Sequence, residues 1–364
     1  MTHPWLDALL GFLADADGSD LHIKAGTRPR IRVDGNMRVL PVPDPVSPEM
    51  TAEVVEAIMP PAVRERFGST YEADFAYSTP LLGRFRVNAY MQRGSVALVL
   101  RQVRSVIPTL EQLGMPDVVR DLADNPRGLV LVTGPTGSGK TTTLAAAVDR
   151  INRTRECNIV TIEDPVEYLH EDDLASISQR EVGSDTAGFA PALRSAMRQD
   201  PDVILVGEMR DLETVEAALT AAETGHLVLS TLHTIDSSET VNRIVDVFPP
   251  HQQRQARSTL AGVLRGVVSQ RLIPRATGHG RVPAVEVMVV NGRVQASILE
   301  PQRATELAEL VSEGGYYGMR SFDQSLYDLF EAGTITLDAA LGNASRPHDL
   351  RVRLERAGLV ATGS

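Results

Sequence analysis

The sequence predicts an α/β fold, in which a parallel sheet covered by helices follows a smaller α+β unit and precedes a helical region. Four short apolar runs, at 129–132, 159–162, 203–206 and 227–230, alternate with stretches of helical periodicity, as in sheets built from βαβ units. The first hundred residues instead show the period of two that marks strands with one buried face. We therefore divide the chain into an α+β unit at 1–100, a linker at 101–116, a core at 117–290 and a C-terminal region at 291–364.

The composition is that of an acidic globular protein. The 364 residues carry a formal net charge of -11, which argues against a nucleic-acid partner because neutralising phosphates requires a basic surface. The single cysteine, Cys157, excludes a tetracysteine zinc site within the chain. No apolar run approaches the ~20 residues of a membrane span, and the amino terminus lacks the basic start of a signal peptide. We expect a cytoplasmic protein that does not insert into a membrane.

The α+β unit of residues 1–100 is expected to hold several strands and one well-marked helix. Strands are predicted at 20–23, 30–33, 83–90 and 96–100. The dipeptide Asp34-Gly35 is a hairpin-turn signal after the second of them. Ser47 is predicted to cap a helix that carries apolar residues as far as Met59. The last two strands are expected to pair across a turn at Arg93.

The rest of the chain is expected to change from strands to helices. Residues from Arg254 onward are predicted to be mostly helical, with one strand at 285–290. Ser321 is expected to cap a late helix that carries an apolar stripe.

A glycine-rich loop follows the first apolar run of the core. The stretch from Gly134 to Thr141 fits G-x-x-x-x-G-K-[ST], between a predicted strand and a predicted helix. Glycines allow backbone N–H groups to curl around one anion, and the helix N-terminus adds a partial positive charge. Lys140 is expected to reach the β- and γ-phosphates of ATP, and the Thr141 hydroxyl to ligate Mg²⁺. The predicted ATP-binding residues are Gly134, Pro135, Thr136, Gly137, Ser138, Gly139, Lys140, Thr141, Thr142 and His233.

Polar residues follow the other three apolar runs, and parallel strands bring their carboxyl ends to one edge of a sheet. An acid after an apolar strand is the Walker B arrangement, so we expect Glu208 to orient the attacking water and to contact Mg²⁺ through water. Glu163 is the competing base and metal contact, with capping of the next helix as its structural alternative. His233 is expected to contact the γ-phosphate or a carboxylate, or to be structural. Gly207 stands where an aspartate often ligates the metal.

Arginines cluster at the end of the first unit. Phosphoryl transfer gains from an extra cation on the γ-phosphate, which a neighbouring subunit can supply. Arg84, Arg86, Arg101 and Arg104 lie in and after the last two predicted strands of the unit, and we take the first three as candidate donors. The alternative is that they are solvated surface residues.

These motifs together resemble the type II/IV secretion ATPases that drive type IV pili, most closely the PilT-type retraction ATPases. The resemblance rests on 18–22 and 32–35 for the N-terminal signature, 134–141 for Walker A, 161–167 for the Asp box, 198–211 for Walker B and 224–234 for the His box. The stretches 281–288 and 317–324 also resemble retraction members. One element of that type, A-I-R-N-L-I-R-E, is present only in altered form at 296–303.

The resemblance implies a motor that hydrolyses ATP to ADP and phosphate to retract pili, as in twitching motility. It implies a PAS-like domain at 1–100 and a RecA-like core at 117–290, assembled into a hexamer. The expected partner is an inner-membrane platform protein, which would hold the motor at the inner face of the cytoplasmic membrane. Extension or type II secretion motors and an accessory retraction motor remain alternatives within the superfamily. Outside it, the alternatives are a P-loop nucleic-acid translocase and a non-catalytic nucleotide-binding scaffold.

Overall fold

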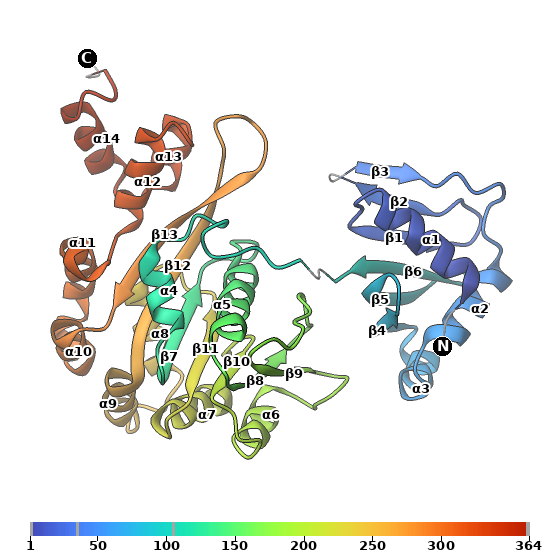
Figure 1. Cartoon of the computed structure of the whole chain (residues 1–364), viewed down its shortest axis with the longest axis horizontal. Helices are drawn as coiled ribbons and strands as arrows, with labels where there is room; N and C mark the ends of the chain where they lie inside the picture. Colours follow the sequence, from blue (N-terminus) through green and yellow to red (C-terminus); the bar gives the residue numbers. More distant parts are fainter. Residues whose placement is uncertain (1–2, 34–35, 104–105, 362–364) are drawn as a thin grey trace. The chain divides into compact units, whose positions relative to one another are not determined.

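The structure, a computed structural model, describes residues 3–33, 36–103 and 106–361. It divides the chain into two compact units (Figure 1), one of Met1–Val106 with Glu167–Leu169 and one of Ile107–Val166 with His170–Ser364. The α/β fold expected from the sequence is confirmed. One detail of the expected linker is wrong: Arg101 belongs to a strand, because it pairs with β-strands on both sides.

The N-terminal unit is an antiparallel sheet with three helices. Its strands lie in the order β3-β2-β1-β6-β5-β4. The elements are α1 Pro4–Asp15, β1 Asp20–Lys24, β2 Arg30–Val33, β3 Asn36–Val39, α2 Pro48–Ile58, α3 Pro61–Thr70, β4 Glu72–Thr79, β5 Gly83–Gln92 and β6 Ser95–Gln102. The cap at Ser47 is confirmed, since its hydroxyl accepts a hydrogen bond from the Met50 amide.

The core of this unit lies between one face of the sheet and helices α1 and α2. Leu6, Leu10 and Val54 from the helices pack with Phe85 and Leu98 from the strands. The expected hairpin of β2 and β3 is confirmed, although its turn residues Asp34 and Gly35 lie outside the described residues. Sequence reasoning missed α3, which carries few apolar residues, and β4, whose alternation is short.

The second unit is built on a seven-stranded sheet in the order β13-β12-β7-β11-β10-β8-β9. All neighbouring strands pair in parallel except β13, which is antiparallel to β12. The strands are β7 Gly128–Thr133, β8 Asn158–Glu163, β9 Ser176–Glu181, β10 Val203–Val206, β11 Leu227–Leu232, β12 Leu264–Pro274 and β13 Arg281–Val289. The four apolar runs of the sequence are β7, β8, β10 and β11, so those predictions are confirmed.

Alternate residues of each central strand face opposite sides of this sheet. Val130 and Leu205 pack against α4 Asp117–Ala123 and α5 Lys140–Thr154. Leu131 and Ile204 pack against the opposite set of helices, which are α6 Phe189–Ala196, α7 Leu212–Glu223, α8 Ser237–Asp246 and α9 Gln253–Val263. Because helices cover both faces of the sheet, residues facing either side are buried, which explains why these strands are continuous apolar runs in the sequence.

The expectation of a mostly helical chain after Arg254 is partly wrong. Residues 264–274 form β12, which pairs with β7 and β13 and extends the sheet. The helices beyond it are α10 Gly292–Leu299, α11 Leu307–Glu313, α12 Phe322–Glu331, α13 Leu337–Asn343 and α14 Pro347–Arg356, with short 3-10 segments at Pro301–Glu306 and Gly314–Tyr317. Ser321 caps α12 in a full capping box, as expected. In the described part of the chain, no helix is long and apolar enough to cross a bilayer.

Candidate active site

The loop between β7 and α5 forms a tight backbone turn. Its glycines 134, 137 and 139 have positive φ angles of 140°, 78° and 91°, which residues with a side chain rarely adopt. A Cβ atom on Gly134 would lie 2.3 Å from the Gln270 carbonyl oxygen. A Cβ atom on Gly137 would meet nothing within 4 Å, so this side of the loop is open. The glycines therefore fit the loop against β12 on one side and leave room for a ligand on the other.

Lys140 begins α5 and turns back over the loop. Its side-chain Nζ donates hydrogen bonds to the carbonyl oxygens of Gly134 at 2.8 Å and Pro135 at 3.1 Å, although the residue is only 9% exposed. A buried ammonium group needs compensation, and a phosphate group at the loop would supply it. Thr141 and Thr142 follow in the first turn of α5, where backbone N–H groups have no partner within the helix.

The residues present fit a polyphosphate group. The Ser138 hydroxyl is buried and has no hydrogen-bond partner in the structure. It lies in a loop whose helix begins with a lysine and a threonine, the donor set that binds phosphates and Mg²⁺ in P-loops. Described His, Cys, Asp and Glu residues form no preassembled group of three or more that could hold a metal, so Thr141 would share such an ion with substrate oxygens and water.

Gln270 supports the loop from β12, and sequence reasoning missed it. Its side-chain Oε1 accepts a hydrogen bond from the Thr143 hydroxyl at 2.9 Å. Its Nε2 lies 2.8 Å from where a Gly139 Cβ would be. Gln270 and Thr143 are 127 residues apart in sequence, and no local pattern connects them. The glutamine thus fixes the base of the loop to the neighbouring strand.

The end of β10 carries Glu208 in a polar environment. Its carboxylate Oε2 lies 2.7 Å from Arg210 Nε and 3.5 Å from His233 Nε2. The Glu208 side chain is 19% exposed, and those of Arg210 and His233 are 69% and 45% exposed. The expected proximity of Glu208 and His233 is therefore present. Arg210 is an additional partner, which the sequence-based site did not include.

Gly207 is closely packed between neighbouring strand ends. A Cβ atom there would lie 3.3 Å from the Ile162 carbonyl oxygen and 3.4 Å from the Glu163 Cα atom. Its carbonyl oxygen accepts a hydrogen bond from the Thr231 hydroxyl at 2.6 Å. This packing leaves little room for an aspartate at position 207, and Glu208 is the first acid after β10.

The end of β8 carries Glu163 in a more closed environment. The residue is 8% exposed. Its carboxylate Oε1 accepts hydrogen bonds from the Thr161 hydroxyl at 2.6 Å and from Gln179 Nε2 at 3.1 Å. Gln179 comes from β9, so Glu163 is tied to its own strand and the next.

The order of the strands brings these residues to one edge of the sheet. In that order β7, β11, β10 and β8 are neighbours and run in parallel. The register pairs Thr133 with Leu232 and Val206 with Ser230, so the residues that follow these positions leave the sheet together. The P-loop, His233, Glu208 and Glu163 therefore occupy consecutive positions along this carboxyl edge.

The candidate arginines lie in the N-terminal unit. Arg86 and Arg101 are direct cross-strand partners on β5 and β6. Arg86 Nε lies 3.8 Å from an oxygen of Asp74, and Arg101 Nε lies 2.7 Å from one of Asp20. Burial opposes ionisation of Asp20, but hydrogen bonds from Ser19 and Arg101 hold its pKa below the usual value.

The expected placement of Arg84 and Arg86 on β5 is confirmed, because Phe85 and Val87 between and after them are buried. Arg104, the fourth arginine of the cluster, lies outside the described residues.

Comparison with known proteins identifies the family to which this site belongs. Residues 82–321 match the model of the type II/IV secretion system protein family. The chain belongs to this family.

Two relatives from Pseudomonas aeruginosa illustrate the membership. The type IV pilus retraction ATPase PilT is 45% identical over 94% of this chain and 98% of its own length, and the type IV pilus ATPase PilU is 41% identical over 96% and 91%. A crystal structure of the pilus retraction motor PilT with bound ADP is 44% identical, with a TM-score of 0.86, and covers 94% of this chain and 99% of that one. The resemblance inferred from the sequence motifs is thus confirmed.

Proposed function

We propose that this member of the type II/IV secretion system family is an ATP-hydrolysing motor that powers retraction of type IV pili. The main support is the carboxyl edge of the second sheet, where Lys140, His233 and Glu208 stand on three neighbouring strand ends. That edge belongs to a chain 45% identical to a pilus retraction ATPase over almost all of both lengths.

The P-loop binds and orients the triphosphate in this proposal. Backbone N–H groups of residues 134–139 and the start of α5 surround the β- and γ-phosphates. Lys140 exchanges its bonds to the Gly134 and Pro135 carbonyls for phosphate oxygens. Thr141 contributes its hydroxyl to Mg²⁺, which when bound neutralises charge on the β- and γ-oxygens. The partnerless Ser138 hydroxyl gains an acceptor when nucleotide binds.

Glu208 orients the water that attacks the γ-phosphorus. It is the more accessible of the two acids, and its partners are the exposed side chains of Arg210 and His233. The anionic carboxylate can accept a proton from water, while Arg210 and His233 hold it in place. Glu163, whose Oε1 already accepts from Thr161 and Gln179, maintains the neighbouring strand end and would contact a bound Mg²⁺ through water.

The proposal extends to domains, partners and location. The second unit corresponds to a RecA-like ATPase core and the first to a PAS-like domain, and six copies form a ring. Arg84, Arg86 or Arg101 of a neighbouring subunit then supplies the extra cation of phosphoryl transfer. The ring acts at the cytoplasmic face of the inner membrane, on a platform protein of the pilus.

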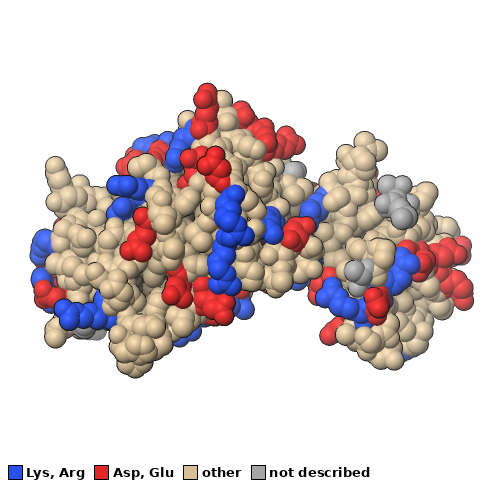
Figure 2. Space-filling view, turned by 90° about the horizontal axis from the view of Figure 1, so that it is seen from below, with Lys and Arg blue, Asp and Glu red and all other residues tan. Residues whose placement is uncertain are grey.

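Two rival functions are less well supported. Extension and secretion motors share the family, and PilU shares almost as much sequence with this chain as PilT does. A nucleic-acid translocase needs a continuous basic surface. On the face shown in Figure 2, acidic and basic residues are interspersed instead, and the whole chain carries a net charge of -11.

The proposal is tested by removing the P-loop amine and by counting pili. Lys140→Ala is expected to reduce ATP hydrolysis to background, because the phosphates lose their buried cation. Deleting the gene is expected to leave cells with excess surface pili that do not retract. Cells without pili would instead indicate an extension motor, and normal turnover by the Lys140 variant would reject the site.

The arginine assignment has its own test. Mixing the Lys140→Ala protein with an Arg84, Arg86 or Arg101 variant should restore part of the hydrolysis in mixed rings, since each partner supplies what the other lacks. Each arginine variant assayed alone, at the same total protein concentration, is the control. If no combination recovers activity, none of the three acts on a neighbour's nucleotide.

A further inference from the structure

The N-terminal unit contains a pocket of about 370 Å³ that is separate from the carboxyl edge of the second sheet. Three adjacent strands form it. Lys24 pairs with Ala97, and Gln92 pairs with Ser95, so the end of β1 and the β5–β6 turn meet over the start of β6. The turn after β1, with Gly26 and Thr27, closes one side.

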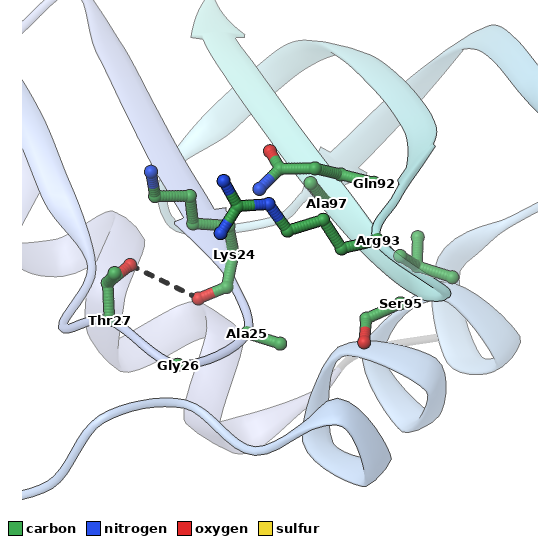
Figure 3. A pocket seen from close by; sticks show the side chains of 9 residues that line it. Lys24, Ala25, Gly26, Thr27, Gln92, Arg93, Ser95 and Ala97 are labelled. Atoms are coloured by element: carbon green, nitrogen blue, oxygen red, sulfur yellow. Dashed lines mark hydrogen bonds between the residues drawn. The ribbon is translucent and has the colours of Figure 1, made fainter.

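Two cations converge on this pocket. Figure 3 shows the Arg93 side chain reaching across it toward Lys24, with the Gln92 amide nearby. None of the lining residues is acidic. Within 3–33, 36–103 and 106–361, neither Lys24 nor Arg93 takes part in an ion pair. Both side chains are exposed, so water screens their mutual repulsion, and together they leave the pocket positively charged, which favours an anion over a cation as its ligand.

The backbone at Arg93 gives a second, independent indication. Arg93 and Gly94 form a two-residue hairpin turn with φ angles of 51° and 78°. Turns with two positive φ angles favour asparagine or glycine at the first position, and an arginine there is conformationally costly. Backbone strain of this kind is enriched at functional sites, so it points to a role for the Arg93 side chain. Here the side chain is one of the two cations that line the pocket.

The amino-acid usage singles out Lys24 as well. The chain has 36 lysines and arginines together, and only Lys24 and Lys140 are lysines. Lys140 is the P-loop residue. A lysine is a compact point charge with three rotatable donors, whereas arginine presents a rigid fork. A lysine beside an arginine suits a phosphate group, which accepts from both kinds of donor.

We propose that this pocket binds a small ligand through a phosphate group held by Lys24 and Arg93. The Ser95 hydroxyl and the Gln92 amide are neutral donors among the lining residues, whereas the Thr27 hydroxyl already donates to the Lys24 carbonyl oxygen at 3.3 Å. The volume is roughly that of a dozen water molecules and lies at the lower end of small-molecule sites. It therefore accommodates a phosphate ester rather than only a bare ion. The proposal does not depend on the proposed motor function.

The two lysines make the pocket directly testable with pyridoxal 5′-phosphate. Its aldehyde condenses with the Lys24 amine to an imine and water, and borohydride reduces the imine to a stable amine. Peptide mass spectrometry of the full chain then separates Lys24 from Lys140. We expect Lys24 to be labelled about tenfold more by pyridoxal 5′-phosphate than by 5′-deoxypyridoxal, which keeps a free aldehyde but lacks the phosphate, because a charged hydrogen bond to phosphate is worth about that factor. Equal labelling by the two compounds would overturn the site.

Variants separate the role of Arg93 from its effect on folding. Arg93→Gly relieves the positive φ angle, so the thermal midpoint should stay the same or rise, while Lys24 labelling falls about tenfold. Arg66→Gln removes an exposed arginine of α3 outside the pocket and should leave labelling unchanged. If the two variants label alike, Arg93 is not a ligand of the phosphate and the proposal fails.

Competition identifies the source of the phosphate. Protection of Lys24 by glycerol 3-phosphate but not by vesicles indicates a soluble phosphate ester. Stronger protection by phosphatidylglycerol vesicles than by phosphatidylcholine vesicles indicates a lipid headgroup. Lack of protection by either, or by inorganic phosphate, would contradict the proposal.

Discussion

The ends of β8 and β10 lie side by side, and each carries a glutamate, but the two side chains are held differently. Glu163 is 8% exposed and accepts two hydrogen bonds from neutral groups of its own sheet. Glu208 is more open, and its partners Arg210 and His233 are largely exposed. Hydrogen bonds to a carboxylate stabilise its charged form and so weaken it as an acceptor for a proton from water. The comparison favours Glu208 as the reactive acid and Glu163 as a support.

Replacing Glu208 gives the largest expected effect. Glu208→Gln keeps the size of the side chain but removes its capacity to accept a proton, so kcat should fall by about 10³. Nucleotide affinity should change little, because Lys140 and the P-loop remain. Steady-state ATPase assays and fluorescent-nucleotide binding measure the two quantities. Normal ATP hydrolysis by the Glu208→Gln variant would show that Glu208 is not the reactive acid.

The second prediction concerns acid sensitivity at the β8 end. The His170 amide donates to Gln179, the residue that also donates to Glu163. Burial lowers the pKa of His170 to about 4. The unfolded chain therefore binds more protons than the folded one between pH 6.5 and about 4, and stability is lost as pH falls through that window. Between pH 7 and pH 5 the loss should be about 2 kcal/mol.

Urea unfolding at the two pH values measures this loss. His170→Gln should remove most of the difference, because its side chain does not titrate. His279→Gln, on the exposed turn between β12 and β13, is the matched control and should leave the difference intact. Equal pH dependence in all three proteins would show that His170 is not the group responsible.

The third prediction tests the supporting role of Glu163. In Glu163→Gln the amide oxygen can still accept from Thr161 and Gln179, so only the charge assistance is lost. Stability should fall by about 1 kcal/mol, with kcat within a few-fold of normal. Chemical denaturation and ATPase assays provide both values. Trapping of bound ATP by this variant, but not by Glu208→Gln, would exchange the roles of the two acids.

The smallest expected effect is that of Arg210. Its side chain is 69% exposed, and ion pairs of such residues contribute less than about 1 kcal/mol. Arg210→Gln should therefore lower kcat only a few-fold, through looser orientation of Glu208. His233 also contacts Glu208 and can partly replace Arg210 in holding it. The double variant with His233→Asn should therefore lose more activity than the product of the two single effects. Additive losses would mean that the two side chains act on Glu208 independently.

The sequence was sufficient to locate most of this site because its main parts are local patterns. The P-loop and the acids and histidine after the apolar runs could be read directly, and parallel strands bring such ends together. Two of the missed parts depend on long-range contacts. Gln270 supports the P-loop from a strand more than a hundred residues away, and β12, which follows α9 without an intervening loop, is fixed by its pairing with β7 and β13. Arg210 was missed although it lies only two residues from Glu208, because no periodicity in the sequence marks their contact.

One consequence concerns β12, whose consecutive residues serve different parts of the second unit. Gln270 holds the base of the P-loop, while the guanidinium of Arg271 lies 3.9 Å from the centre of the Phe322 ring in α12. Ile273 and Ala284 bury their side chains under the same C-terminal helices. Truncating the chain before α12 would therefore expose apolar side chains of β12 and β13 to water. It would also destabilise the strand whose Gln270 supports the glycine-rich loop. The C-terminal helices from α12 onward therefore stabilise the same strand that supports the glycine-rich loop.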